Sequence, residues 1–173
     1  GQEAYCLAFN LLDIMPDAAQ YDIKILATDI DRPVLRYAVD GSYPEAAVGE
    51  LCREHREKYL EPTGTADQHR IADVARAVVS FRFLNLTKPW PFRGMFDVIM
   101  CRNVAIYFDE ATRVKMWSRF ANQMTFGATL YIGHSENVSG PALDFLKPTA
   151  NSTYTRCAGT GDDAQQARSG VSK

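Results

Sequence analysis

The stretch that decides the fold is Phe96-Asp97-Val98-Ile99-Met100-Cys101-Arg102-Asn103-Val104-Ala105-Ile106-Tyr107-Phe108-Asp109. Residues 96–101 form an apolar run with a single acid, which is typical of a strand buried on both faces of a parallel sheet. The polar residues Arg102, Asn103 and Tyr107 follow that strand, and Asp109 begins an amphipathic helix. Ligands of open α/β sheets bind beyond the carboxyl ends of the strands. The stretch therefore delivers polar side chains to the place where such a fold does its chemistry.

Helical and strand patterns alternate along the rest of the chain. Apolar residues recur at helical spacing from Ala4 to Met15, where Pro16 stops them. Asp31 is suited to cap a helix that has Pro33 in its first turn. The helix that follows Asp109 has a face of Val114, Trp117, Ala121 and Met124, and Gly127 is expected to end it. Further strands are predicted at residues 23–28, 78–84 and 128–132, with a closing hairpin at 145–149 and 152–156.

Residues 41–78 differ from the rest because they mix acidic and basic residues around a Pro62-Thr63-Gly64 turn. We expect an exposed helix at 50–59 and short antiparallel strands through Ile71 and Val74. The fold class is therefore α/β: a doubly wound Rossmann-like sheet with a closing antiparallel hairpin and a small inserted β-subdomain. One domain is expected over residues 1–157, with the insertion at about 41–78, followed by a disordered tail at 158–173.

Composition excludes several classes of protein. The net charge of −2 gives no electrostatic reason to expect binding to nucleic acid. No apolar run approaches the roughly 20 residues that span a bilayer, and the first residues do not resemble a signal peptide. The four cysteines lie far apart without a CxxC pair, so neither a zinc site nor a disulfide framework is indicated. We expect a monomer in a reducing cytoplasm.

Asp29 is the first candidate ligand-binding residue, because an acid at the end of such a strand commonly bonds ribose hydroxyls. Helix capping is the alternative, but Asp31 already serves that purpose. No third ligand is spaced to join the two acids, so no metal site is predicted. Glu3 is interpreted as an acid in the first turn of a helix, where its negative charge interacts favourably with the helix dipole. His134 is interpreted as a structural residue and not as a catalytic base.

Asn85-Leu86, at the end of another predicted strand, presents a polar edge and an apolar surface that suit a flat base, although an ordinary loop explains the pair better when it is taken alone. Four blocks of sequence then occur in a distinctive order. They are Ala27-Thr28-Asp29-Ile30-Asp31 with Val34-Leu35, Asn85-Leu86, Cys101-Arg102-Asn103-Val104 with Ile106-Tyr107-Phe108-Asp109, and Gly133-His134-Ser135-Glu136-Asn137. Together these blocks resemble the chemotaxis receptor glutamate methyltransferases, the CheR family, over nearly the whole folded chain.

That resemblance implies transfer of a methyl group from S-adenosylmethionine to glutamate side chains of chemoreceptor cytoplasmic domains, with S-adenosylhomocysteine as the product. Asp29 would bind the ribose, and Asn85 and Leu86 would flank the adenine. Asn103 would bind cofactor beside the catalytic residues Tyr107 and Arg102. Gly1-Gln2-Glu3-Ala4-Tyr5 is similar to the end of the family's Gly-Glu-Glu-Pro-Tyr motif, which implies a place for Glu3 near the methionine amine.

Competing interpretations stay open. A dehydrogenase requires G-x-G-x-x-G, which is absent, and nucleic-acid amino-methyltransferases carry Asn/Asp-Pro-Pro-Tyr where this chain has Arg102-Asn103-Val104. The alternative from another class is a non-catalytic, methyltransferase-like module that binds cofactor or protein. The family's first sheet strand, most of its glycine-containing cofactor loop and its basic N-terminal helical domain have no counterpart in this sequence. We therefore expect the chain alone to bind cofactor weakly and to show no detectable methylation.

Overall fold

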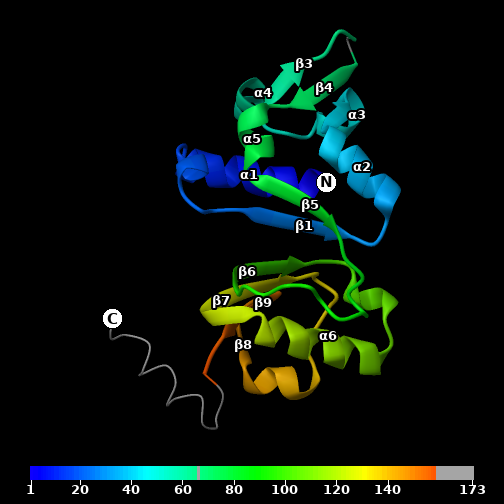
Figure 1. Ribbon diagram of the computed structural model, residues 1–173, viewed down its shortest axis with the longest axis vertical. Helices are drawn as coiled ribbons and strands as arrows, with labels where there is room; N and C mark the ends of the chain where they lie inside the picture. The colour runs from blue at the N-terminus through cyan, green and yellow to red at the C-terminus, as the bar shows by residue number, and fades with distance from the viewer. Residues whose placement is uncertain (66, 159–173) are drawn as a thin grey trace. The chain divides into compact units, whose positions relative to one another are not determined.

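The computed structural model describes residues 1–65 and 67–158 and shows a mixed α/β fold. The chain divides into two compact units, Gly1–Asn85 and the part from Leu86 onward. The strands of the described residues form three sheets, with the orders β1-β5, β2-β4-β3 and β6-β7-β9-β8 (Figure 1). Within the described part of the chain, no helix has the length and apolar character required to cross a membrane.

The first unit is built on a parallel pair of strands, β1 (Ile25–Asp29) and β5 (Val79–Phe83). Helix α1 (Gln2–Ile14) packs against both strands, and the short helix η1 (Ala18–Gln20) follows it. The core of this unit includes Tyr5, Phe9 and Tyr59, of which the last two stack with ring centroids 4.7 Å apart. The helical spacing of apolar residues predicted α1 because those residues face this core.

Helix α2 (Arg32–Asp40) begins as the sequence predicts. The Asp31 carboxylate accepts a hydrogen bond from Val34 N at 3.1 Å, and Pro33 lies in the first turn. Gly41 ends the helix with a φ of 71°, a left-handed conformation that favours glycine.

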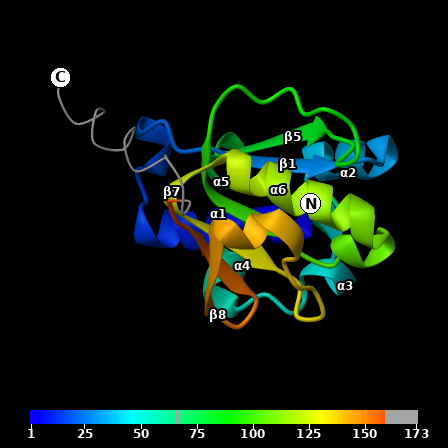
Figure 2. The same ribbon diagram turned by 90° about the horizontal axis from the view of Figure 1, so that it is seen from below.

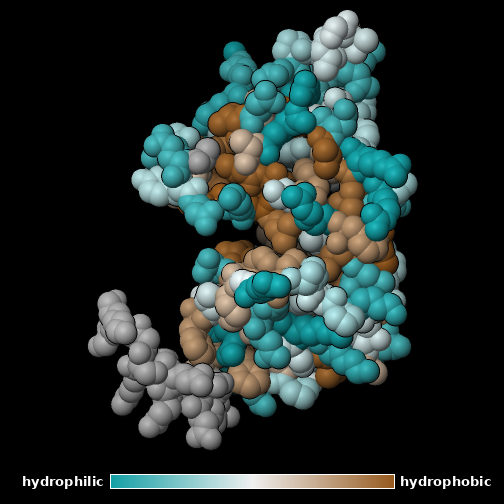
Figure 3. Space-filling model, in the orientation of Figure 1, coloured by the Kyte–Doolittle hydropathy of each residue, from teal (hydrophilic) through white to brown (hydrophobic). Residues whose placement is uncertain are grey.

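The expected insertion contains a three-stranded antiparallel sheet of β2 (Ser42–Pro44), β4 (Gln68–Ile71) and β3 (Leu60–Pro62). Short helices α3 (Glu45–Val48), α4 (Arg53–Tyr59) and α5 (Asp73–Ala77) accompany it. Hydrophilic and neutral residues dominate the surface of this region, at the top of Figure 3. One carboxylate ties it to α1, because Asp13 accepts hydrogen bonds from His55, Lys58 and Tyr59 at 2.6–2.7 Å.

The second unit contains the sheet of β6 (Phe96–Cys101), β7 (Met124–Ile132), β9 (Thr153–Arg156) and β8 (Leu146–Ala150). β6 and β7 are parallel, and β9 pairs antiparallel with both β7 and β8 to form the predicted hairpin. Helices α6 (Glu110–Asn122) and η3 (Gly140–Asp144) lie side by side on one face of this sheet (Figures 1 and 2), and η2 (Ala105–Tyr107) precedes α6. The fully buried Trp117 of α6 belongs to the core of this unit.

Four local predictions were wrong. Gly127 does not end a helix: α6 stops at Asn122, and Gly127 lies within β7, where its φ of 80° accompanies a shift in register against β6. Met124 consequently belongs to β7 and not to the helix face. Val74 lies in α5 and not in a strand. β6 is not buried on both faces, since Val98 is 56% exposed.

The parallel pairs β1–β5 and β6–β7 belong to different units, and their union in the single predicted sheet stays a prediction. The predicted tail lies, apart from residue 158, outside the described residues.

Candidate functional site

In the first unit, Asp29 lies at the carboxyl end of β1, where it pairs in register with Phe83 of β5. Its Oδ1 atom accepts a hydrogen bond from Asp31 N at 2.8 Å. This bond fixes the direction of a half-buried carboxylate at the edge of the sheet. An oriented carboxylate at this edge is suited to accept hydrogen bonds from a ligand's hydroxyl groups.

Gly1 and Glu3 lie at the start of α1 in the first unit, Gly1 as the residue before the helix and Glu3 in its first turn. A Cβ atom at Gly1 would lie 2.5 Å from Ala38 Cβ and 2.9 Å from Tyr43 Oη, so the start of α1 and the α2 region approach closely only because residue 1 is glycine. The first unit thus carries two acidic candidates, Glu3 in the first turn of α1 and Asp29 at the end of β1.

Asn85 and Leu86 follow β5 after Leu84 but belong to different units. Asn85 is half-buried at the end of the first unit. The Leu86 carbonyl accepts hydrogen bonds from Trp90 Nε1 at 3.2 Å and Arg119 Nη1 at 3.0 Å, and its side chain packs against the core of the second unit. Each residue is therefore positioned by its own unit.

In the second unit, polar residues follow the parallel strands β6 and β7, whose ends pair through Cys101 and Ile132. Arg102 and Asn103 are exposed, and Asn103 adopts a left-handed backbone with a φ of 57°. Tyr107, at the end of η2, is 80% exposed. Arg102, Asn103 and Tyr107 therefore all follow β6 beyond its carboxyl end.

Glu136 holds the loop that carries Asn103. Its buried carboxylate accepts hydrogen bonds from the backbone N–H groups of Asn103, Val104 and Ala105 and of Gly133. The sequence pattern assigned no role to Glu136 beyond its place in the block at residues 133–137. The available signal was an acid placed three residues after Gly133, directly beyond a buried strand.

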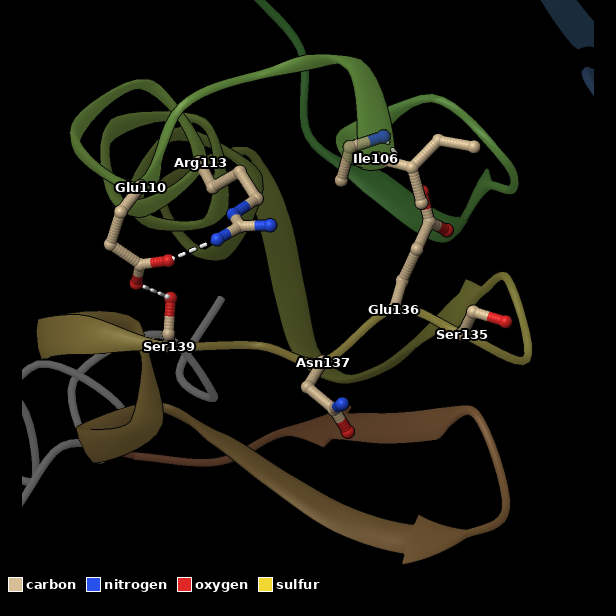
Figure 4. A pocket seen from close by; sticks show the side chains of 8 residues that line it. Ile106, Glu110, Arg113, Ser135, Glu136, Asn137 and Ser139 are labelled. Atoms are coloured by element: carbon tan, nitrogen blue, oxygen red, sulfur yellow. Dashed lines mark hydrogen bonds and ion pairs between the residues drawn. The ribbon is translucent and has the colours of Figure 1, made fainter.

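A pocket of about 190 Å³ lies beside this loop (Figure 4). Its lining residues are Ala105, Ile106, Glu110, Arg113, Ser135, Glu136, Asn137 and Ser139. Glu110 accepts hydrogen bonds from Arg113 and from Ser139 Oγ, and the Arg113 guanidinium together with that hydroxyl lowers the pKa of Glu110. The paired charges of Glu110 and Arg113 make this wall close to neutral.

The structure thus places the predicted residues in two sets. Glu3, Asp29 and Asn85 belong to the first unit, and Leu86, Arg102, Asn103 and Tyr107 belong to the second. His134 is exposed in the turn after β7. Across residues 1–65 and 67–158, no cluster of three or more His, Cys, Asp or Glu side chains has an arrangement that could hold a metal ion.

Comparison with known proteins identifies relatives. A family model described as "CheR methyltransferase, SAM binding domain" matches residues 1–153. A probable chemotaxis protein methyltransferase of Rhizobium etli is 43% identical over 156 residues, which cover 89% of this chain and 58% of that protein. A chemotaxis protein methyltransferase of Borreliella burgdorferi is 37% identical over 86% of this chain and 53% of its own length. The chain therefore spans about half the length of these relatives.

Proposed function

Since the chain belongs to the CheR methyltransferase family, we propose that it binds S-adenosylmethionine and takes part in methyl transfer to glutamate side chains of chemoreceptors. The observation that carries this proposal is the position of the polar residues. Asp29 ends β1, and Arg102, Asn103 and Tyr107 follow β6, so each set lies at the carboxyl end of a parallel strand. Those ends are where α/β folds bind their ligands.

The residues present fit an adenosyl cofactor. The Asp29 carboxylate, directed by Asp31 N, is proposed to accept hydrogen bonds from the ribose hydroxyls. Glu3, in the first turn of α1, has the negative charge that a methionine ammonium group requires. Asn85 and Leu86 are proposed to offer an amide edge and an apolar face to adenine. Asn103 is the remaining proposed cofactor-binding residue.

When bound, S-adenosylmethionine would supply a sulfonium methyl group for transfer to a carboxylate oxygen, which would give a methyl ester and the thioether S-adenosylhomocysteine. A glutamate carboxylate has a reference pKa near about 4.3, so at neutral pH the chain needs no general base. What this chain contributes is alignment of the reactants and exclusion of water, and alignment alone can lower a barrier by about 7–11 kcal/mol.

Tyr107 is proposed to orient the reacting groups through its hydroxyl while it stays neutral, since tyrosine has a reference pKa near about 10. Arg102 beside a sulfonium would repel it. Its guanidinium is therefore assigned to the attraction of the anionic glutamate or to support of the loop.

We also propose that the chain has the Rossmann-like doubly wound fold expected for this chemistry and acts as a monomer in the cytoplasm. The parallel pairs β1–β5 and β6–β7 support the fold, and the net charge of −2 favours a protein partner over nucleic acid.

The test is transfer of radiolabelled methyl groups to membranes that contain a chemoreceptor. The chain is assayed alone and in an extended form, in which it is joined behind the preceding residues of the Rhizobium etli relative. Methyl esters release their label in base whereas N-methyl groups do not. We expect base-labile label from the extended form and little from the chain alone.

Two matched variants sharpen this assay. Asp29→Asn in the extended form should lose activity, and Asp31→Asn should retain it because asparagine also caps helices. If the extended form transfers no base-labile methyl groups, the proposal is wrong. Cofactor binding without transfer would favour the non-catalytic module.

A further inference from the structure

Glu136 uses both of its carboxylate oxygens within the second unit. Oε1 accepts hydrogen bonds from Val104 N at 2.9 Å and Ala105 N at 2.7 Å. Oε2 accepts from Asn103 N at 3.1 Å and Gly133 N at 2.6 Å. The residue is only 6% exposed, and Figure 4 shows its side chain extending from the turn after β7 toward the loop that carries Ile106.

A buried carboxylate is unfavourable unless hydrogen bonds replace its hydration. Successive backbone N–H groups that converge on one point form a concave site for an anion. Here the N–H groups of residues 103–105 converge on the chain's own carboxylate. Glu136 therefore fills an anion site that joins the loop after β6 to the turn after β7.

The local backbone agrees with this role. Asn103 has a φ of 57°, a conformation that non-glycine residues adopt at an energetic cost and that persists where the surroundings fix it. A Cβ atom at Gly133 would lie 2.6 Å from Glu136 Oε2 and 2.9 Å from Asn103 N. The absence of a side chain at Gly133 is thus what allows the carboxylate to reach the loop.

We propose that Glu136 is a positioning residue that fixes the left-handed backbone of Asn103 and the turn that leads to Tyr107, without itself touching cofactor or substrate. The link to methyl transfer rests on the proposed function, because it depends on the roles of Asn103 and Tyr107. The claim that Glu136 fixes the loop does not depend on the proposed function, because it rests only on the hydrogen bonds.

Two variants perturb the same contact from opposite sides. Glu136→Gln keeps the shape of the side chain but replaces one acceptor oxygen with an NH2 group, which then faces two N–H donors. Gly133→Ala keeps the carboxylate and crowds it. Glu110→Gln is the matched control, because Glu110 lies in the same pocket but bonds Arg113 and Ser139 instead of the loop. Leu146→Ala, in β8, controls for a general loss of stability.

Amide hydrogen exchange on the complete chain gives the first readout. We expect the amides of residues 103–105 to exchange about tenfold faster in Glu136→Gln and in Gly133→Ala, with the amides of β8 and β9 unchanged. Glu110→Gln should leave residues 103–105 unchanged, and Leu146→Ala should accelerate exchange throughout the unit. Unchanged exchange at residues 103–105, or a uniform increase like that of Leu146→Ala, would overturn the proposal.

Binding of S-adenosylhomocysteine to the extended form gives the second readout. Glu136→Gln and Gly133→Ala should weaken binding by about tenfold or more, and Glu110→Gln should not. A loosened loop with unchanged affinity would overturn the positioning role. If the unmodified extended form does not bind S-adenosylhomocysteine, the proposed function fails, and the exchange measurement still decides whether Glu136 holds the loop.

Discussion

Substitution of Asp29 tests the proposed ribose contact, because the structure separates the two tasks of its carboxylate. Oδ1 is bonded to Asp31 N at 2.8 Å, so Asp29→Asn can retain this turn through its amide oxygen while it removes the charge. Asp29→Ala removes both, and the lost turn bond should lower the free energy of unfolding by about 0.5–1.5 kcal/mol. Neither change disturbs a packed core, since Asp29 lies at the edge of the sheet.

The effect on cofactor affinity should be larger than the effect on stability. Hydrogen bonds to a charged group contribute about 1.5–3 kcal/mol, and each 1.4 kcal/mol is about tenfold in affinity. Asp29→Asn in the extended form should therefore weaken S-adenosylhomocysteine binding by about ten- to a hundredfold in calorimetry, and Asp29→Ala by at least as much. Asp31→Asn serves as the control. Unchanged affinity of Asp29→Asn would refute the ribose assignment.

Three further predictions concern other parts of the chain. Tyr107→Phe in the extended form should lower kcat for receptor methylation far more than it weakens cofactor binding, because the hydroxyl acts in the transition state. An unaltered kcat would mean that the Tyr107 hydroxyl has no role in methyl transfer. Leu146→Ala should lower the free energy of unfolding by about 2–5 kcal/mol in a urea titration, since Leu146 is fully buried, and a loss well below that would mean that the site collapses. Hydrogen bonds from Lys58, Tyr59 and His55 lower the pKa of Asp13. The contribution of Asp13 to stability is therefore present above its unfolded pKa of about 3.9 and is lost as the pH falls through the lower pKa of the folded state. Asp13→Asn should flatten the pH dependence of urea unfolding in acid, and an unchanged pH dependence would contradict this.

Elements with local signals were predictable from the sequence. Asp31 and Asp109 both cap helices as predicted, because a cap requires only an acid and an N–H group three residues later. The apolar run at residues 96–101 also predicted β6 from local composition alone. Arg102 and Asn103 follow that parallel strand, as predicted.

Features that depend on distant partners were not predictable. The left-handed conformation of Gly127 suits a helix end as well as an irregular strand, and only the pairing with β6 decides between them. The role of Glu136 was not predictable because its hydrogen-bond donors in the loop are backbone N–H groups 31–33 residues away, and backbone groups leave no pattern in the sequence. The roles of the predicted cofactor residues stay predictions.

The distribution of tryptophan has a practical consequence for measuring stability. Both tryptophans, Trp90 and Trp117, belong to the second unit, whereas five of the eight tyrosines (residues 5, 21, 37, 43 and 59) belong to the first. Because Trp117 is fully buried, intrinsic tryptophan emission reports the melting of the second unit only. Circular dichroism in the far ultraviolet follows the backbone of both. Coincident curves from the two signals would mean that the units melt as one cooperative system, and separated curves would give each unit its own transition.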